Sequence, residues 1–318
     1  MQSRTTSTAT VDADKGLAAL IDPVGVEAFV GEYLGKQPLL IHGDAHRFAS
    51  LFSWSLLNEV LASTRFDMHR MRVKGSDGLL NASRYIEPAP QIAPRGNPYR
   101  FSAEKLPRVL SDEGTLVIDC FDYYHAPLRR LTGLLEESFH SVTQVNLYMN
   151  QTNIRAQSIL HWDDHEVFVV QAEGHKKWTL YPSTAPHPVH GLSEPSEPAA
   201  DGESWSGVLS KGDMLYVPRG WWHQVHASEG PSVHLSFSTR LPSGVSLLDR
   251  FVKHLVSTHP AIRRDLPLFG QGSEQDKWLG EFRDAVVTTL DDPVLLRHLI
   301  DAERRTPQER PSFSFSSE

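Results

Sequence analysis

The chain has 318 residues, of which 40% are hydrophobic and 22% charged, so it can bury a core and is not disordered throughout. Its formal net charge of −8 argues against a nucleic-acid binder that works by bulk positive charge, and no apolar run approaches the roughly 18 residues that cross a bilayer. The single cysteine, Cys120, excludes disulfides and thiolate zinc sites within one chain and favours a reducing, cytoplasmic setting, whereas 16 histidines make imidazole the expected metal ligand.

Residues 15–110 are predicted to form a mixed, mainly helical N-terminal part. Residues 1–14 precede it and are expected to be a flexible tail without a secretory signal. A helix is predicted to open at Asp22-Pro23 and to end at Gly35, because Asp can cap a helix and Pro suits its first position. Three further elements are predicted in order: a strand at 38–41, a helix capped by Ser53, and an extended surface loop at 86–100.

Residues 111–241 are predicted to form a β core. Within it, a strand at 115–120 and a helix at 127–139 precede a segment, 142–149, in which apolar and polar residues alternate as in a half-buried strand. Further strands are predicted at 167–171, 177–181, 214–217 and 232–238, with a long polar loop at 182–207. Many short strands separated by turns predict a sandwich or barrel. Helical periodicity returns in a C-terminal part, 242–305, and 306–318 is expected to be a tail.

The segment His161-Trp-Asp163-Asp-His165 contains the first two parts of a predicted metal site. Residues two apart on a strand point to the same face, so His161 and Asp163 are expected to reach one point together. His223 follows a Pro-x-Gly turn and is expected to start a later strand, from which it supplies a third ligand. Two histidines and one carboxylate form the facial triad of non-haem Fe(II) oxygenases, which leaves open positions on the metal. One His-x-Asp triplet is expected by chance among 16 histidines, but its combination with the later segment favours a metal site.

Five other histidines compete with this triad and are less favoured as ligands. His165 follows the first ligand by four residues, a metal spacing on a helix only, and His226 follows the third by three, which turns it to the opposite face of a strand. His234 is expected on a core strand where it could line a pocket. His187 and His190 lie in the polar loop and are expected to be exposed.

Two further groups of polar residues are candidates for binding a cosubstrate. Lys176 follows a turn at Gly174, and alternation requires only one of Lys176 and Lys177 to face inward. A buried lysine needs an anionic partner, which the dicarboxylate 2-oxoglutarate would supply; alternatively, both lysines are surface charges. Asn146 and Tyr148 share one polar strand face, which either lines a cosubstrate pocket or faces solvent.

The two metal motifs carry a family resemblance. The run HWDDHEVFVVQAEGHKKWTLYP and the later GDMLYVPRGWWHQVH resemble the JmjC-type cupin oxygenases, above all the bacterial cupin 4 branch, which includes ribosomal oxygenases that hydroxylate Arg or His residues. The segments GEYLGKQPLLIHG, GTLVIDCFDYYHAPLRRL and QVNLYMN are similar to upstream parts of the same branch, and the resemblance covers about residues 25–270. The sequence GWWH is closer to the asparaginyl hydroxylase type, and NQTNIRAQSIL lacks the Pro/Gly-rich pattern of the branch, so the substrate stays open.

The resemblance implies a mainly β fold with flanking helices: a double-stranded β-helix, or jelly-roll, core between a helical N-terminal part and a helical C-terminal part. It implies Fe(II) as the metal and 2-oxoglutarate as the cosubstrate. The catalytic metal ligands that it implies are His161, Asp163 and His223. The cofactor-binding positions that it implies are Lys176, which pairs with the distal carboxylate of 2-oxoglutarate, and Asn146, Tyr148 and Ser236.

The expected function is hydroxylation, with O₂, of an unactivated C–H bond in an amino-acid side chain of a peptide or protein. One alternative is a hydroxylase of a free or carrier-bound amino acid or another small metabolite; an N-methyl demethylase ranks lower. A non-redox metal-binding cupin, such as an isomerase or sugar-binding module, would have no use for Lys176, and the intact triad argues against a non-enzymatic scaffold. No membrane partner is expected, and the apolar faces of the C-terminal helices are expected either to form a homodimer or to pack within the chain.

Overall fold

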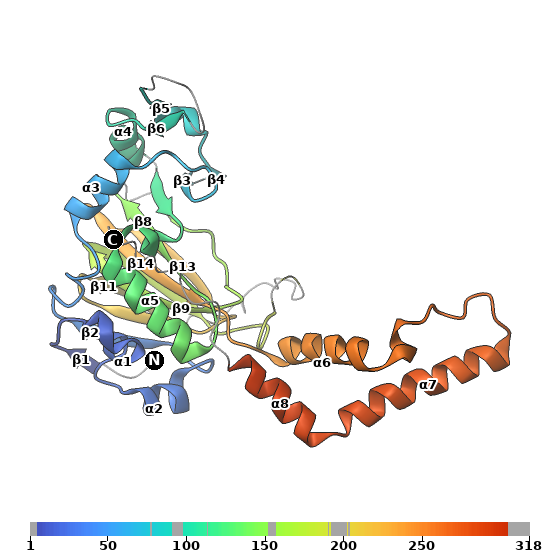
Figure 1. Cartoon of the computed structure of the whole chain (residues 1–318). Coiled ribbons are helices and arrows are strands. Elements are labelled where there is room, and N and C mark those ends of the chain that lie inside the picture. Colours follow the sequence, from blue (N-terminus) through green and yellow to red (C-terminus); the bar gives the residue numbers. More distant parts are fainter. Residues whose placement is uncertain are drawn as a thin grey trace, which may run out of the picture. The chain divides into compact units, whose positions relative to one another are not determined.

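The structure is a computed structural model that describes residues 5–76, 78–90, 98–112, 114–151, 157–189, 191, 202 and 204–304. The chain divides into two compact units, Met1–Arg240 and Leu241–Glu318 (Figure 1). None of the helices in the described ranges has both the length and the apolar character needed to cross a membrane.

A mixed sheet of nine strands is the largest element of the first unit. Its strands, in spatial order, are β1 (Thr5–Ser7), β2 (Leu39–Gly43), β12 (Met214–Val217), β9 (Glu166–Glu173), β14 (Ser232–Thr239), β8 (Thr143–Asn150), β7 (Thr115–Ile118), β3 (Met71–Gly75) and β4 (Gly78–Leu79). β1 runs parallel to β2, and every other neighbouring pair is antiparallel. Five of its eight neighbouring pairs join strands that are not consecutive in the chain, as in a jelly roll.

A second, smaller sheet lies against the first. It consists of β11 (Trp205–Ser210), β10 (His175–Tyr181) and β13 (Trp222–Ala227), all antiparallel, and β10 is central. One hydrophobic cluster joins the two sheets, with Val169 and Leu215 from the large sheet and Trp178, Leu180 and Leu209 from the small one. The expected mainly β core with helices on both sides in sequence is therefore confirmed.

Short helices and a hairpin complete the first unit. The helices are α1 (Leu17–Leu20), α2 (Val26–Ala28), α3 (Trp54–Ser63), α4 (Lys105–Asp112) and α5 (Ala126–Phe139), with 3-10 turns at Ala13–Lys15, Ala82–Arg84 and Phe121–Tyr124; β5 (Ile86–Pro88) pairs with β6 (Tyr99–Phe101). α5 lies across β8 and β14 and buries Leu128, Leu131 and Leu135, which recur on one face of the helix (Figure 1). Ser53 caps α3, as predicted, because its hydroxyl accepts a hydrogen bond from the Leu56 amide.

The N-terminal segment differs from its prediction. The expected tail is wrong from Thr5 onward, because β1 pairs with β2 and becomes the edge strand of the large sheet. The expected helix begins at Val26 rather than Asp22 and continues as a π-helical turn, Phe29–Tyr33. Asp22 is not its cap; its carboxylate accepts a hydrogen bond from the Ser7 hydroxyl. The expected loop at 86–100 contains the hairpin β5–β6, and residues 91–97, 192–201 and the expected tail at 306–318 lie outside the described residues.

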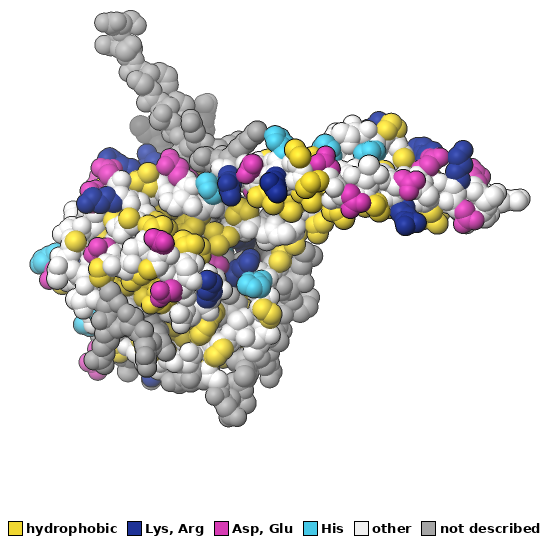
Figure 2. All heavy atoms as spheres, turned by 90° about the horizontal axis from the view of Figure 1, so that it is seen from below, with side chains coloured by type: hydrophobic (Ala, Val, Ile, Leu, Met, Phe, Trp, Pro, Cys, Tyr) yellow, Lys and Arg dark blue, Asp and Glu magenta, His cyan; other side chains and the backbone are white. Residues whose placement is uncertain are grey.

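The second unit is helical. It contains α6 (Gly244–Thr258), a 3-10 turn at Pro260–Arg263, α7 (Gly272–Leu290) and α8 (Pro293–Glu303). Asp292 caps α8 by accepting hydrogen bonds from two backbone amides of its first turn. The core of this unit is small, with Phe251, Leu255 and Leu299 buried. Many other apolar side chains of these helices lie at the surface, between charged ones (Figure 2).

Candidate metal centre and its cavity

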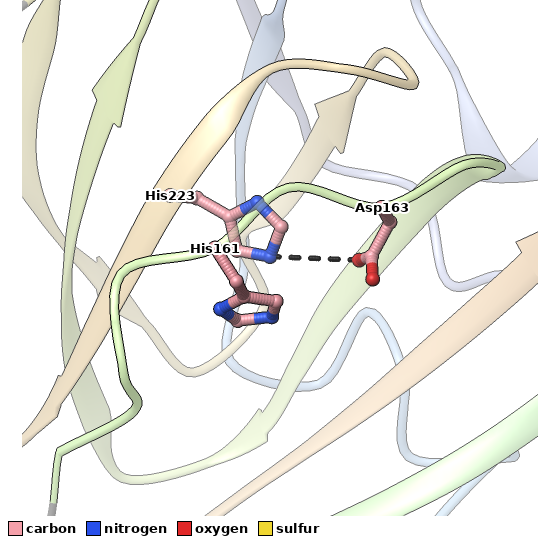
Figure 3. Close-up of side chains that lie close together, drawn as sticks. All are labelled: His161, Asp163 and His223. Atoms are coloured by element: carbon pink, nitrogen blue, oxygen red, sulfur yellow. Dashed lines mark ion pairs between the residues drawn. The ribbon is translucent and has the colours of Figure 1, made fainter. Parts of the chain in front are cut away.

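Three side chains with metal-binding atoms meet between the two sheets. His161, Asp163 and His223 each offer one such atom, and these atoms lie within 4.8 Å of one another. His223 Nε2 and Asp163 Oδ2 are 3.5 Å apart. Figure 3 shows both imidazoles and the carboxylate directed toward one another, His223 from one strand and the other two from the segment before β9.

Backbone pairing brings the two parts of this triad together. His161 and His223 form an isolated antiparallel bridge in which each amide donates to the other carbonyl, at 3.2 and 2.7 Å. Gly220 holds the backbone of the carboxylate ligand in place, because its amide donates a hydrogen bond to the Asp163 carbonyl at 2.8 Å. Gly220 has a φ of 82°, a conformation that favours glycine, and this conformation of the Pro-x-Gly turn accompanies the hydrogen bond to Asp163. The predicted strand around His161 is an extended segment held by this bridge.

Both imidazoles are oriented by a backbone carbonyl two residues earlier in the chain. His161 Nδ1 lies 2.7 Å from the Ile159 carbonyl oxygen, and His223 Nδ1 lies 3.1 Å from that of Trp221. Because a carbonyl oxygen only accepts, each Nδ1 must carry the proton and donate it. The lone pair of each Nε2 is then free for a metal, which is the usual arrangement of metal-binding histidines.

The charges at the site favour ligands that are ready to bind. Burial, together with the neighbouring His161, lowers the pKa of His223 to about 4, which keeps this imidazole neutral. Burial alone would raise the pKa of Asp163, but the adjacent His223, His165 and His161 outweigh it, so the pKa of Asp163 lies below its ordinary value. A neutral imidazole and an ionised carboxylate are the protonation states that metal binding requires.

The triad opens into a cavity of about 520 Å³ within the first unit. Lys176 also lines this cavity and is only 2% exposed, whereas Lys177 on the same strand is exposed and lies outside it. Lys176 Nζ lies 2.8 Å from His234 Nδ1 and 3.4 Å from the Tyr148 carbonyl oxygen. None of the described carboxylates forms an ion pair with it, and burial lowers its pKa to about 7.

The other residues predicted to bind a cosubstrate line the same cavity. Asn146, Tyr148 and Ser236 all contribute to its wall, from β8 and β14. Asn146 and Ser236 are directly paired across these two strands, and Tyr148 is paired with His234, so their side chains share one face. The Tyr148 ring stacks on the His234 ring, with centroids 4.7 Å apart, and burial raises the pKa of Tyr148 to about 12. His234 lines the cavity, as anticipated.

This arrangement agrees with a comparison against protein families. Residues 123–247, which include the triad and the cavity-lining strands β8, β9, β10, β13 and β14, match the sequence profile described as the JmjC domain. This chain contains a JmjC domain. Its fold is also that of the ribosomal oxygenase YcfD from Escherichia coli: one YcfD structure is 16% identical and covers 86% of this chain and 69% of its own, with a TM-score of 0.53. A YcfD structure that is 16% identical, with a TM-score of 0.52, is described as a complex with cobalt and 2-oxoglutarate.

Curated relatives of the JmjC domain are longer proteins. Ribosomal oxygenase 2 of Mus musculus is 31% identical over 263 residues, which cover 78% of this chain and 53% of that protein. The bifunctional lysine-specific demethylase and histidyl-hydroxylase NO66 of Drosophila persimilis is 25% identical over 297 residues, which cover 90% of this chain and 41% of that protein. The chain thus spans about half the length of these relatives or less.

The competing histidines are placed differently around the JmjC site. His165 lines the cavity with Nε2 3.8 Å from Asp163 Oδ1, but it is not one of the three residues whose ligand atoms converge. Its Nδ1 is buried and has no hydrogen-bond partner among the described residues. His226 pairs with Gln157 and does not line the cavity. His187 is exposed, and His190 lies outside the described residues.

One wall of the cavity was not predicted from the sequence. The hairpin of β3 and β4 contributes Lys74 and Leu79 to it, and Thr115 of β7 lies beside them. On β3 the apolar Met71 and Val73 are buried, whereas Arg72 is half-buried and Lys74, which lines the cavity, is exposed. This alternation is the signal that could have located the strand, although it extends over only four residues.

Proposed function

We propose that this chain is an Fe(II)- and 2-oxoglutarate-dependent oxygenase that hydroxylates an unactivated C–H bond in an amino-acid side chain of a peptide or protein. One observation carries the proposal: a two-histidine, one-carboxylate triad and a buried lysine without a carboxylate partner among the described residues line the same cavity. The triad would hold the metal and leave positions open, and the lysine would hold an anionic cosubstrate.

The residues present fit the metal. His161 and His223 offer their Nε2 atoms because each Nδ1 proton is donated to a backbone carbonyl, and Asp163 is ionised. These donors suit Fe(II), and they would also accept other divalent first-row metals. The ring of Trp178 lies alongside that of His223, with centroids 5.9 Å apart, and packs this ligand in place.

The residues present also fit 2-oxoglutarate. A buried ammonium group is costly without a negative partner, and Lys176 contacts only neutral groups, at His234 and the Tyr148 carbonyl. The distal carboxylate of 2-oxoglutarate would supply the missing charge. Burial and the adjacent Lys176 lower the pKa of His234 well below its ordinary value, so His234 stays neutral and leaves the single positive charge to Lys176.

When bound, Fe(II) together with 2-oxoglutarate and O₂ supplies the oxidising chemistry that converts a C–H bond to C–OH, with succinate and CO₂ as the other products. The protein positions the reacting groups and limits access of water. Lys176 would fix one end of the cosubstrate, and Asn146, Tyr148 and Ser236 would line its side. Orientation of the substrate then decides which carbon reacts.

A peptide or protein substrate is supported by the rim of the cavity and by the relatives. Ile159 and Leu79 both line the cavity yet are 76% and 67% exposed, which is costly unless a partner covers them. A substrate longer than one amino acid could contact both. The related NO66 proteins are named for action on lysine and histidine side chains, and ribosomal oxygenase 2 for action in a ribosomal context.

The first test is the visible spectrum of the metal-free protein after anaerobic addition of Fe(II) and then 2-oxoglutarate. We expect a charge-transfer band that requires both additions, is lost in Asp163→Ala and is weakened in Lys176→Ala. Asp164→Asn is the matched control, because the Asp164 carboxylate accepts a hydrogen bond from Arg240 and is not part of the triad. Tight metal binding without any band would instead support a non-redox metal-binding cupin. If the band forms, succinate release with peptide pools and with metabolite pools separates a protein substrate from a small one.

We also propose that the C-terminal unit pairs with a second copy of itself. The exposed apolar residues of α6 are Val245, Leu248, Val252 and Val256, and this spacing places them on one stripe. Asp249 and Lys253, between them, form an ion pair within the helix, so the stripe is bordered by both charges and is electrostatically compatible with itself. Such a self-complementary stripe suits a two-fold interface.

A further inference from the structure

Lys74 stands out among the cavity residues because the proposed chemistry gives it no role. It lies on β3, where it is directly paired with Leu79 of β4 on one side and Thr115 of β7 on the other. Thr115 is in turn paired with Asn150 of β8. All four residues line the cavity that contains the triad, so this cross-strand row forms part of its wall.

The neighbouring cation on the same strand is already neutralised. Arg72 makes two hydrogen bonds to the carboxylate of Asp119. Lys74, by contrast, has no hydrogen bond or ion pair with any described residue, and Asp77, a carboxylate close to it in sequence, lies outside the described residues. Lys74 is an exposed residue that lines the cavity. Partial desolvation and the adjacent Arg72 lower its pKa, while Asp119 and the metal-site carboxylate Asp163 oppose this effect. Lys74 and Asp163 line the same cavity, so a substrate bound at the metal centre can also reach Lys74.

In the cavity with metal and 2-oxoglutarate bound, Lys74 has no negative charge to balance its own. A divalent metal on Asp163 carries one net positive charge, if the imidazoles are uncharged, and Lys176 carries another. The two carboxylates of 2-oxoglutarate balance both charges. The ammonium group of Lys74 is then the remaining unbalanced charge among the described cavity residues, and a negative group on the substrate would complement it.

The row also supplies a second donor for such a group. The Thr115 hydroxyl accepts a hydrogen bond from Asn150 Nδ2 at 2.6 Å, which leaves its own proton available to donate. An ammonium group and a hydroxyl donor side by side suit a carboxylate, which accepts several hydrogen bonds. Leu79, paired with Lys74 across the hairpin, adds an apolar surface next to this polar corner.

We infer that Lys74, with Thr115, is a specificity-determining residue that selects substrates carrying a carboxylate near the C–H bond to be hydroxylated. This inference rests on the proposed function and names its substrate class. The carboxylate is either an Asp or Glu side chain close to the target residue in a peptide, or the α-carboxylate of a free amino acid. In both cases it occupies the corner formed by Lys74 and Thr115.

Binding to a redox-inactive form of the protein tests this inference. Protein loaded with Zn²⁺ and 2-oxoglutarate is titrated at low salt into fluorescein-labelled peptides centred on His or Arg, each with one Asp at a defined position beside the centre and each matched by an Asn peptide. We expect the Asp peptide to bind about fivefold more tightly at one or two positions, equivalent to about 1 kcal/mol. Free histidine and arginine are compared with their amides by displacement, which separates the two sources of the carboxylate.

Variants assign the preference to its residue. Lys74→Met should reduce the ratio between the acidic and the neutral ligand to about one, and Lys74→Glu should reverse it in favour of a Lys-containing peptide. Lys177→Met, which removes an exposed lysine outside the cavity, should leave the ratio unchanged. In the Fe(II) enzyme, Lys74→Met should raise KM for the acidic substrate by a similar factor and leave kcat nearly unchanged.

Two outcomes overturn the inference. One is the absence of any preference for the carboxylate in the wild-type protein, including the absence of binding; the other is a preference that Lys74→Met retains. Binding of 2-oxoglutarate to the Zn²⁺ protein is measured separately. Its absence contradicts the proposed function, whereas its presence without a carboxylate preference contradicts the role of Lys74 alone.

Discussion

At the scale of single residues, Lys176 makes cosubstrate binding depend on pH. Its pKa in the free protein is about 7, and a bound carboxylate favours its charged form. Above pH 7 the lysine must therefore take up a proton when 2-oxoglutarate binds, and the affinity should fall by up to about tenfold for each further pH unit. Calorimetric titration of the Zn²⁺-loaded protein from pH 6 to 9, in two buffers of different ionisation enthalpy, measures both the affinity and the proton uptake.

Lys176→Arg is the control for this pH dependence. Arginine keeps its charge throughout this pH range. The affinity of the variant for 2-oxoglutarate should therefore be nearly the same at pH 6 and pH 9, and binding should occur without proton uptake. A wild-type protein that binds without proton uptake at pH 8 would show that Lys176 is already charged in the free cavity, or that another group holds the anion.

The same lysine also lowers the stability of the free protein. Its pKa falls from 10.5, the ordinary value, to about 7 on folding, so between these values the unfolded chain binds more protons and stability rises with pH. Below pH 7 both states are protonated, and the full cost of burying the charge is present. We expect Lys176→Met to raise the free energy of unfolding by about 2–4 kcal/mol at pH 6 and by less at pH 9, as measured by urea denaturation.

Lys177→Met provides the comparison, because Lys177 neighbours Lys176 on β10 but is exposed. This variant should change the free energy of unfolding little at either pH. A stabilisation by Lys176→Met that has the same size at pH 6 and pH 9 would contradict the lowered pKa, since the difference between the two values reports the titration.

At the scale of secondary-structure elements, the turn from β9 to β10 determines whether Lys176 faces inward. Gly174 occupies this turn with a φ of 64°, and a Cβ atom there would lie 2.1 Å from the carbonyl oxygen of Pro231. Gly174→Ala should therefore lower the free energy of unfolding by at least about 2 kcal/mol, through the strained conformation and the clash together. Urea denaturation measures the loss.

Gly230→Ala separates these two contributions. Gly230 has a similar φ of 83°, but a Cβ atom there would meet no atom within 4 Å other than those of its chain neighbours. It should lose only about 1 kcal/mol, the cost of the left-handed conformation alone. Equal losses in the two variants would mean that the strand beside Gly174 moves away easily and that the turn does not fix the register of β10.

The elements that could be predicted from the sequence are those whose pattern reflects burial on one face. α5, β8 and β14 carry regular apolar positions, and their predicted ranges agree with the structure within a few residues. β13 was recognised only as the strand that His223 begins, because its apolar residues are divided between both faces: Val225 lines the cavity, whereas Trp222 does not. β3 is short, and its partner β7 is more than 40 residues away in the sequence, so its pairing could not be inferred.

The same reasoning applies to the site. The spacing of His161 and Asp163 and the position of His223 after a Pro-x-Gly turn predicted three residues that the structure brings together, since ligand type and turn chemistry are local properties. Lys74 joins the cavity only through the pairing of β3 with β7 and of β7 with β8, which is a property of the whole sheet. A role for Lys74 could therefore be inferred only from the three-dimensional arrangement.

At the scale of the whole molecule, the second unit is less well buried than the first. Four apolar residues are buried in its described part, Phe251, Leu255, Ala285 and Leu299, whereas exposed apolar side chains occur on all three helices. The stripe on α6 is the most regular of these, and Leu248 and Val252 at its centre are 59% and 53% exposed. A helix that is apolar on two sides is stable in water when a second surface covers the outer side.

A pair of charged substitutions on α6 tests whether a second copy provides that cover. If it does, the wild-type chain sediments as a dimer, and Leu248→Glu with Val252→Glu yields a monomer, because two like charges then face their counterparts across the two-fold axis. The control, Lys253→Gln, changes an exposed charge beside the stripe and should remain dimeric. The stability of a dimer depends on protein concentration, so the free energy of unfolding of the wild type is extrapolated to low concentration. It should then match that of the monomeric variant, because the stripe stabilises the chain through association and not through folding of one chain. A wild-type protein that sediments as a monomer at all concentrations would exclude this pairing and leave the stripe to a different partner.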